Sequence, residues 1–216
     1  MHCLCCHREL LPEEEFVCLE CLLSFPLVNS ADPQNPLWAK LSGQIAFEHA
    51  TTFAYYEHGD KFTMLPRKAK YEGQPRINAY LTRQLLQRLE GSGWPYDIDA
   101  IIPVPIHWTR LLQRGYNQAA PIARTLSKAW HIPEETSCLK RVKSMRSQLK
   151  AEEAERGDIF KEVFKVRHPE RLKGKHVLLV DDICTTGSTL CACGKELLEV
   201  SGLRLSVLTL GMTLSV

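Results

Sequence analysis

The sequence has no apolar run approaching the roughly 20 residues that a helix needs to span a membrane. Its apolar C-terminal stretch, LSVLTLGMTLSV, is too short and predicts a buried strand instead. The N-terminal MHCLCCHREL lacks the apolar core of a secretory signal peptide, and the chain contains no internal repeat or low-complexity tract. These absences argue against membrane insertion and a repeat architecture, so we expect a cytoplasmic protein.

What the chain does contain suits a globular protein. It has 216 residues, of which 44% are hydrophobic and 24% charged, enough for one full-sized α/β domain and a small extra module. Residues 26–46 hold three Pro and several small polar residues, a composition typical of a linker. We expect a zinc-binding module over residues 1–30, a linker over residues 31–48 and the α/β domain over residues 49–216.

Nine Cys occur in the chain, and four of them form two CxxC pairs separated by eleven residues. This usage indicates reduced thiols and metal ligation rather than a disulfide framework. Four thiolates complete a closed tetrahedral shell around one structural zinc ion. The predicted ligands are Cys3, Cys6, Cys18 and Cys21. The alternative is a set of buried free cysteines, and Cys5, His2 and His7 are spare ligands that leave the register open.

The stretch VLLVDDICTTGSTL occupies residues 177–190 and joins a strand to a helix. Val177–Val180 predicts a fully buried strand, and Thr189–Glu199 predicts the helix that follows. The loop between them therefore lies at the carboxyl end of a strand, where α/β sheets bind ligands. A glycine allows a tight turn, and free N–H groups at a helix N-terminus attract an anion. The candidate phosphate-binding residues are Thr185, Thr186, Gly187, Ser188 and Thr189.

Two adjacent acids, Asp181 and Asp182, open this loop. They do not suit a phosphate, but they suit sugar hydroxyls or a magnesium ion. The stretch therefore predicts a ligand with a phosphate at one end and a diol at the other. The alternative is an ordinary turn capped by Thr, against which the complete order of strand, acid pair, threonine pair, glycine and helix argues.

Basic residues follow a second predicted strand, Asp99–Val104, in the stretch PIHWTRLLQRGYNQAA. Arg110 and Arg114 either face an anionic ligand or form a solvent-exposed helix turn. Farther on, a basic loop holding Lys143 and Arg146 either closes over a pyrophosphate or is a surface loop.

The net charge of +2 conceals an uneven distribution along the chain. Residues 1–60 carry two Lys and Arg against nine Asp and Glu, a balance of −7, whereas residues 61–150 carry sixteen against six, a balance of +10. The excess of positive charge lies in the segments that flank the predicted phosphate site, and it fits a polyanionic ligand. It fits single-stranded nucleic acid equally well.

These stretches together resemble the ComF family, the competence protein F-like phosphoribosyltransferases. The resemblance covers nearly the whole chain and is carried by the paired CxxC start and by KYEG, IIPVPIHWTRLLQRGYNQA, RVKSMRSQ, LKAEEAER and LLVDDICTTGSTL. The last of these resembles the phosphoribosyl-pyrophosphate (PRPP) signature of type I phosphoribosyltransferases. Met145 stands where the family usually has Thr, and Ile159 stands where it often has Asn.

The resemblance implies a type I phosphoribosyltransferase-like fold, an α/β fold in which helices flank a parallel sheet, with a small N-terminal four-cysteine zinc module. It implies that Asp181 and Asp182 hold the ribose hydroxyls of magnesium-bound PRPP while the following loop binds the 5′-phosphate. The pyrophosphate would be bordered by Pro103, Val104 and Pro105.

Two functions follow from this resemblance. The first is a PRPP-binding protein that handles internalised single-stranded DNA in natural transformation, with proteins of the competence machinery as further partners. The second is an active phosphoribosyltransferase, a glycosyltransferase that moves ribose 5-phosphate from PRPP to an acceptor and releases pyrophosphate. No nucleobase-binding motif identifies that acceptor.

Overall fold

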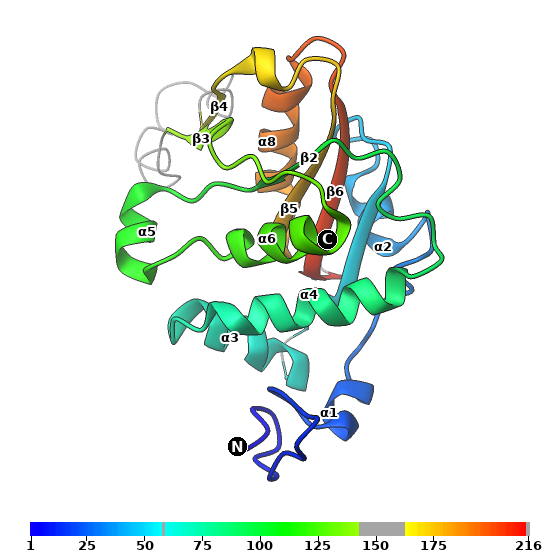
Figure 1. The fold of residues 1–216 in the computed structure, drawn as a ribbon, viewed down its shortest axis with the longest axis vertical. Helices are drawn as coiled ribbons and strands as arrows, with labels where there is room; N and C mark the ends of the chain where they lie inside the picture. Colours follow the sequence, from blue (N-terminus) through cyan, green and yellow to red (C-terminus); the bar gives the residue numbers. More distant parts are fainter. Residues whose placement is uncertain (58, 143–162, 215–216) are drawn as a thin grey trace.

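A four-stranded parallel sheet forms the centre of the molecule (Figure 1). The computed structural model describes residues 1–57, 59–142 and 163–214. The strands lie in the order β1-β6-β5-β2, and every neighbouring pair is parallel. Their bounds are Ala50–Tyr55 for β1, Ala100–Pro103 for β2, His176–Cys184 for β5 and Arg204–Met212 for β6.

The two central strands are buried on both faces, as their near-continuous apolar sequence predicts. Alternate side chains point to opposite faces, so Leu178 and Val180 enter one core while Val177 and Leu179 enter the other. The sheet thus separates two apolar cores, and each core needs its own covering layer.

Three helices cover the first face. Leu81 and Leu85 of one helix and Ile122 and Leu126 of another are fully buried against the sheet, because their spacing places them on one helical face. These helices are α3 (Met64–Tyr71), α4 (Pro75–Leu89) and α6 (Ala119–Trp130).

The second face is covered by two helices and a small antiparallel pair of strands. The core there joins Leu190 and Leu197 to Leu139 and Phe164. The elements are α2 (Pro36–Leu41), α8 (Ser188–Leu198), and an antiparallel pair formed by β3 (Leu139–Arg141) and β4 (Phe164–Val166).

Short elements complete the described chain. One of them, α5, has no buried residue and stands away from the sheet at the left of Figure 1. The elements are α1 (Leu19–Leu23), α5 (Trp108–Arg114) and two 3₁₀ turns, η1 (Lys61–Thr63) and η3 (Pro169–Arg171). None of the described helices combines the length and apolar character needed to cross a bilayer.

The stretch expected as a linker, residues 31–48, contains helix α2 and is packed against the sheet. Leu37 and Leu41 are fully buried in the second core. The Asn35 side chain caps the helix by accepting from the N–H groups of Leu37 and Trp38, and Pro36 occupies the first turn. The prolines and polar residues of this stretch therefore mark a helix start rather than a free linker.

The buried strand predicted over Val177–Val180 is longer than expected and includes the acid pair. Asp181 pairs with Thr209, and Ile183 pairs with Gly211. Gly211 leaves room for the side chain of its partner, since a Cβ there would lie only 2.7 Å from Ile183 Cδ1. The acids thus stand near the carboxyl end of β5 and are held by the sheet.

We expect Leu178→Ala to destabilise the whole sheet. Leu178 is fully buried in the central strand, and removing a buried Leu side chain typically costs about 2–5 kcal/mol because a cavity remains. Urea unfolding measures this loss. Leu112→Ala is the control, because Leu112 is 77% exposed. Equal unfolding midpoints for the two variants would contradict the burial of β5.

Candidate functional site

A cleft of about 560 Å³ opens at the carboxyl ends of β2 and β5. Parallel sheets bind ligands at this edge because loops and helix N-termini converge there. The walls of the cleft include the ends of both strands, the start of α8, and helices α3 and α5. The predicted residues on its wall are Asp181, Asp182, Thr185, Thr189, Val104, Pro105, Arg110 and Arg114.

The two acids carry the negative charge of the cleft. The Asp182 N–H donates to Asp181 Oδ1 at 2.9 Å, and the Ile183 N–H donates to Asp182 Oδ1 at 2.8 Å. Burial raises the pKa of Asp181 well above its ordinary value, the Asp182 carboxylate raises it further, and Lys70 opposes this shift. A cation or a hydroxyl donor placed beside the pair would favour the ionised form of Asp181.

The loop after the acids has the form of an anion site. Gly187 precedes α8 with φ +80°, in the left-handed region, and a Cβ there would lie 3.1 Å from Leu41 Cδ2. The Ser188 N–H donates to Thr186 Oγ1 at 3.3 Å, and the Thr186 hydroxyl donates to Ser188 Oγ at 3.0 Å. Hydroxyls and backbone donors therefore gather at the N-terminus of a helix that is eleven residues long.

The Pro-Val-Pro turn forms the opposite wall. Pro103 is the last residue of β2 and pairs with Val180, whereas Val104 and Pro105 line the cleft. The turn is fixed from both sides, because the Val104 N–H donates to Val180 O at 2.9 Å and Asn117 Nδ2 donates to Val104 O at 3.0 Å. The backbone at this wall is therefore held in place by protein contacts.

Five cations line the cleft. Arg110 and Arg114 were predicted, whereas sequence reasoning did not assign Arg67, Lys70 or Arg141 to this site. The five cations outnumber the two acids, so the cleft has an excess of positive charge suited to an anionic ligand.

Arg141 gives the clearest sign of an anion. Burial lowers the pKa of its guanidinium, and Arg110 lowers it further. Its Nε atom is buried and has no hydrogen-bond partner among the described residues, although its guanidinium lies 5.2 Å from the centre of the Phe164 ring. A buried donor without a partner is costly, and an anion in the cleft would satisfy it.

Helix α3 is fixed to the cleft by Tyr116. The Tyr116 hydroxyl donates to Ala69 O at 2.5 Å, which joins α3 to the connection between α5 and α6. Burial raises the pKa of Tyr116 to about 12, with a further contribution from Asp182. The predicted residues Lys143 and Arg146 lie outside the described residues.

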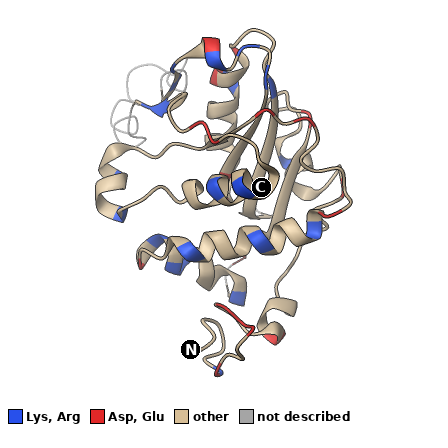
Figure 2. Ribbon diagram, viewed as in Figure 1, with Lys and Arg blue, Asp and Glu red and all other residues tan. Residues whose placement is uncertain are grey.

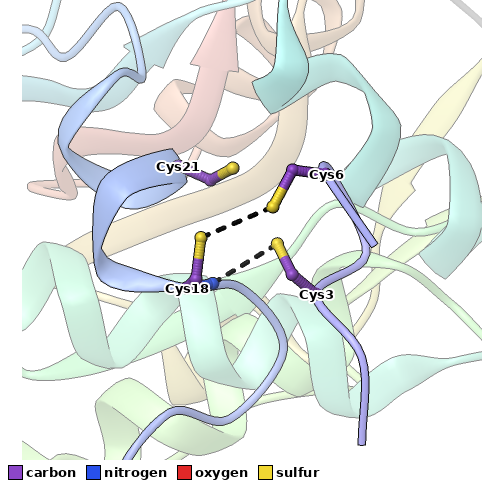
Figure 3. Close-up of side chains that lie close together, drawn as sticks. All are labelled: Cys3, Cys6, Cys18 and Cys21. Carbon is purple, nitrogen blue, oxygen red and sulfur yellow. Dashed lines mark hydrogen bonds between the residues drawn. The ribbon is translucent and has the colours of Figure 1, made fainter. Parts of the chain in front are cut away.

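The four cysteines of the CxxC pairs meet in the N-terminal module (Figure 3). Their four Sγ atoms lie within 4.8 Å of one another, and those of Cys6 and Cys18 are 3.6 Å apart. A tetrahedral zinc shell with Zn–S bonds of about 2.3 Å places its sulfurs about 3.8 Å apart. The donor set and its spacing therefore fit a zinc ion.

Backbone N–H groups favour the thiolate form of Cys3, which is the form that binds a metal. The N–H groups of Cys5 and Cys18 each donate to Cys3 Sγ at 3.4 Å. Burial raises the pKa of Cys3, but backbone N–H groups outweigh it and lower that pKa to about 6. Burial raises the pKa of Cys21, so a fourth thiolate would need a cation beside it.

The spare ligands are not part of this cluster. Cys5 Sγ donates to Lys61 O at 3.5 Å, and burial raises its pKa to about 12. Within the described N-terminal residues, neither His2 nor His7 joins the four sulfurs.

Comparison with known proteins defines the class first. Residues 111–210 match the phosphoribosyl transferase domain, and the parallel sheet flanked by helices is the type I phosphoribosyltransferase fold. The chain is 17% identical to a solved adenine phosphoribosyltransferase, covering 69% of this chain and 75% of that chain, with a TM-score of 0.42.

Curated relatives then define the family. Competence protein F of Haemophilus influenzae is 32% identical over 64% of this chain, and the match spans 62% of that protein's length. DNA utilization protein YhgH of Salmonella typhi is 30% identical over 70% of this chain and 67% of its own length. The chain belongs to the ComF family.

We expect the purified protein to contain about one zinc ion per chain, since a four-thiolate shell holds one ion. Replacing both Cys18 and Cys21 by Ala should remove the zinc and unfold the N-terminal module while the larger domain keeps its sheet. Elemental analysis and limited proteolysis measure the two effects.

The matched control replaces Cys138 and Cys191 by Ala. Both lie outside the cluster, so this variant should keep the zinc. A folded parent protein that contains no metal would overturn the prediction.

Proposed function

We propose that the chain binds PRPP with magnesium in this cleft and acts in handling internalised single-stranded DNA during natural transformation. One observation supports the choice of ligand: an acid pair, a hydroxyl-rich helix N-terminus and five cations line a single cleft of about 560 Å³. PRPP presents a diol between a phosphate and a pyrophosphate, which matches these three groups.

The chemistry of the walls orients the ligand. The loop around Thr186 and Gly187 offers donors to the 5′-phosphate, and the acids accept hydrogen bonds from the ribose hydroxyls. Charge-assisted bonds of this kind are roughly twice as strong as neutral ones. The pyrophosphate then lies toward the Pro-Val-Pro wall, where Arg110 and Arg114 supply positive charge. Magnesium, when bound, offsets the repulsion between the carboxylates and the pyrophosphate.

The role in DNA handling is supported by two observations. The relatives named above carry the names competence protein F and DNA utilization protein. Residues 61–150 also hold a charge balance of +10, which favours binding of a phosphate backbone without sequence preference. This role places the protein in the cytoplasm, where internalised DNA is handled, with competence-machinery proteins as further partners.

The acid pair favours an active phosphoribosyltransferase as a second candidate function. An acceptor nucleophile would bond to C1 of the ribose as the bond from C1 to the pyrophosphate oxygen breaks, and pyrophosphate would leave with that electron pair. Asp181 and Asp182 would stabilise the positive charge that develops on the ribose, and the cations of the cleft would stabilise the leaving group. A screen for pyrophosphate release with candidate acceptors tests this activity.

The N-terminal module has a structural role in this proposal. A closed shell of four thiolates around zinc leaves no open position for chemistry. We place the module at residues 1–30 and the phosphoribosyltransferase-like domain at residues 49–216. Helix α2 lies between them and packs on the latter.

We expect replacement of both Asp181 and Asp182 by Asn to weaken PRPP binding at least tenfold, which corresponds to about 1.4 kcal/mol. The change keeps the side-chain size but removes the charge, and each amide presents donors toward the ribose hydroxyls. Thr186→Val should weaken binding separately by removing a donor to the 5′-phosphate. Isothermal titration with magnesium present measures both. If the double variant binds PRPP as tightly as the parent, the cleft is not a ribose-phosphate site.

Single-stranded DNA binding should fall with rising salt, because it depends on release of counterions from the phosphates. Changing four basic residues of α3 and α5 to Glu should weaken it further; they are Lys68, Lys70, Arg110 and Arg114. Fluorescence anisotropy with an oligo-dT probe measures the affinity.

The control changes four exposed basic residues away from the cleft, with the same change in net charge; they are Arg88, Lys165, Arg167 and Lys173. The changes in α3 and α5 should weaken DNA binding more than these control changes do. DNA affinity that is undetectable at low salt, or that responds equally to both sets, would end this part of the proposal.

A further inference from the structure

A second basic surface lies outside the cleft, in the groove between α4 and α6. The groove has a volume of about 550 Å³, and none of the described residues that line it also lines the cleft. Figure 2 shows basic residues along both helices, which run across the same face of the molecule. The proposed binding of PRPP makes no use of this groove.

The groove has an apolar floor between two charged walls. On α4, Arg76, Ala79, Arg83 and Leu86 follow one another at helical spacing, so they form a single stripe. Ala79 and Leu86 are half-buried, and Ala79 is small enough to admit a close neighbour. A floor of this kind accepts aliphatic side chains.

The walls are positive on both sides. Arg76 and Arg83 stand on α4, Arg124 and Lys128 stand on α6, and no acidic residue lines the described groove. Arg83 forms an ion pair with Glu15, and Arg124 Nε lies 3.9 Å from Glu134 Oε2. Within the described part of the chain, Arg76 and Lys128 have no ion-pair partner. The groove therefore keeps cations available on each wall.

The spacing of these cations matches a helix. Arg76 and Arg83 are seven residues apart, which is about 10.5 Å along a helix axis at 1.5 Å per residue. Carboxylates at positions i and i+7 of a partner helix have the same separation. Arg124 and Lys128, one turn apart, match a carboxylate pair at i and i+4 on its other side.

We propose that the groove between α4 and α6 binds an acidic amphipathic helix of a partner protein. The apolar face of that helix would pack on Ala79 and Leu86, and its Asp or Glu side chains would meet the cations of both walls. Single-stranded DNA fits the groove less well, because no aromatic side chain of the described residues lines it. Sequence-tolerant binding of single strands relies on stacking of bases on aromatic rings.

The test uses synthetic helical peptides of about 18 residues, roughly 27 Å long. Each has Leu and Ala on one face and Glu at the flanking positions, with the i, i+4 and i, i+7 spacings given above. Fluorescence anisotropy measures their binding to the full chain. The peptide controls are the same helix with Gln in place of Glu and a scrambled sequence of the same composition, and both should bind at least tenfold more weakly.

Variants of the protein locate the site. Changing Arg76 and Lys128 to Glu should weaken peptide binding at least tenfold, whereas Arg88→Glu, an exposed arginine of the same helix outside the groove, should leave it within twofold. Ala79→Phe fills the floor without changing the charge and should also weaken binding. Circular dichroism checks that each variant is folded. Affinity for PRPP should remain at the parent value in all of them.

Three results would overturn the proposal. The first is absence of peptide binding at millimolar concentration. The second is an equal loss of peptide affinity when Arg76 and Lys128 are changed to Glu and when Arg88 is changed to Glu. The third is loss of oligo-dT binding in the groove variants without loss of peptide binding, which would assign the groove to nucleic acid. These results leave the proposed PRPP site untouched, because PRPP titration measures that site separately.

Discussion

Adjacent carboxylates at the end of a strand buried on both faces repel one another in a place where water screens them poorly. In this chain β5 carries Asp181 and Asp182 to the edge of the sheet, and burial raises the pKa of Asp181 well above its ordinary value. The pair needs positive charge or hydroxyl donors nearby. The surrounding cleft supplies cations from three separate segments, and a ribose ligand would supply the hydroxyls.

Contacts between distant segments keep this arrangement in place. Tyr116 holds α3 through Ala69, and Asn117 holds the Pro-Val-Pro turn through Val104. On the other side of the sheet, α2 packs closely against residue 187, where a Cβ would lie 3.1 Å from Leu41 Cδ2 and the positive φ favours glycine. The position of each wall therefore depends on the packing of the whole domain, which links the stability of the sheet to the geometry of the site.

Local patterns in the sequence predicted the parts of the site that depend on neighbours in the chain. The buried run before Asp181, the turn at Gly187 and the two CxxC pairs each specify a structure within a few residues. Arg67, Lys70 and Arg141 were missed because their place in the cleft depends on tertiary packing of α3 and β3. The stretch over residues 31–48 was interpreted as a linker because two prolines and several polar residues surround Leu37 and Leu41, the leucines that pack helix α2 into the second core.

The central claim is that the acid pair holds the hydroxyls of a ribose whose phosphate lies in the loop after β5. Isothermal titration of ribose 5-phosphate and 2-deoxyribose 5-phosphate into the parent and the variant with both acids changed to Asn tests it as a thermodynamic cycle. The account predicts that loss of the 2-hydroxyl weakens binding to the parent at least tenfold more than to the variant, a coupling of about 1.4 kcal/mol. An equal loss of affinity in the parent and the variant on removal of the 2-hydroxyl would contradict this claim.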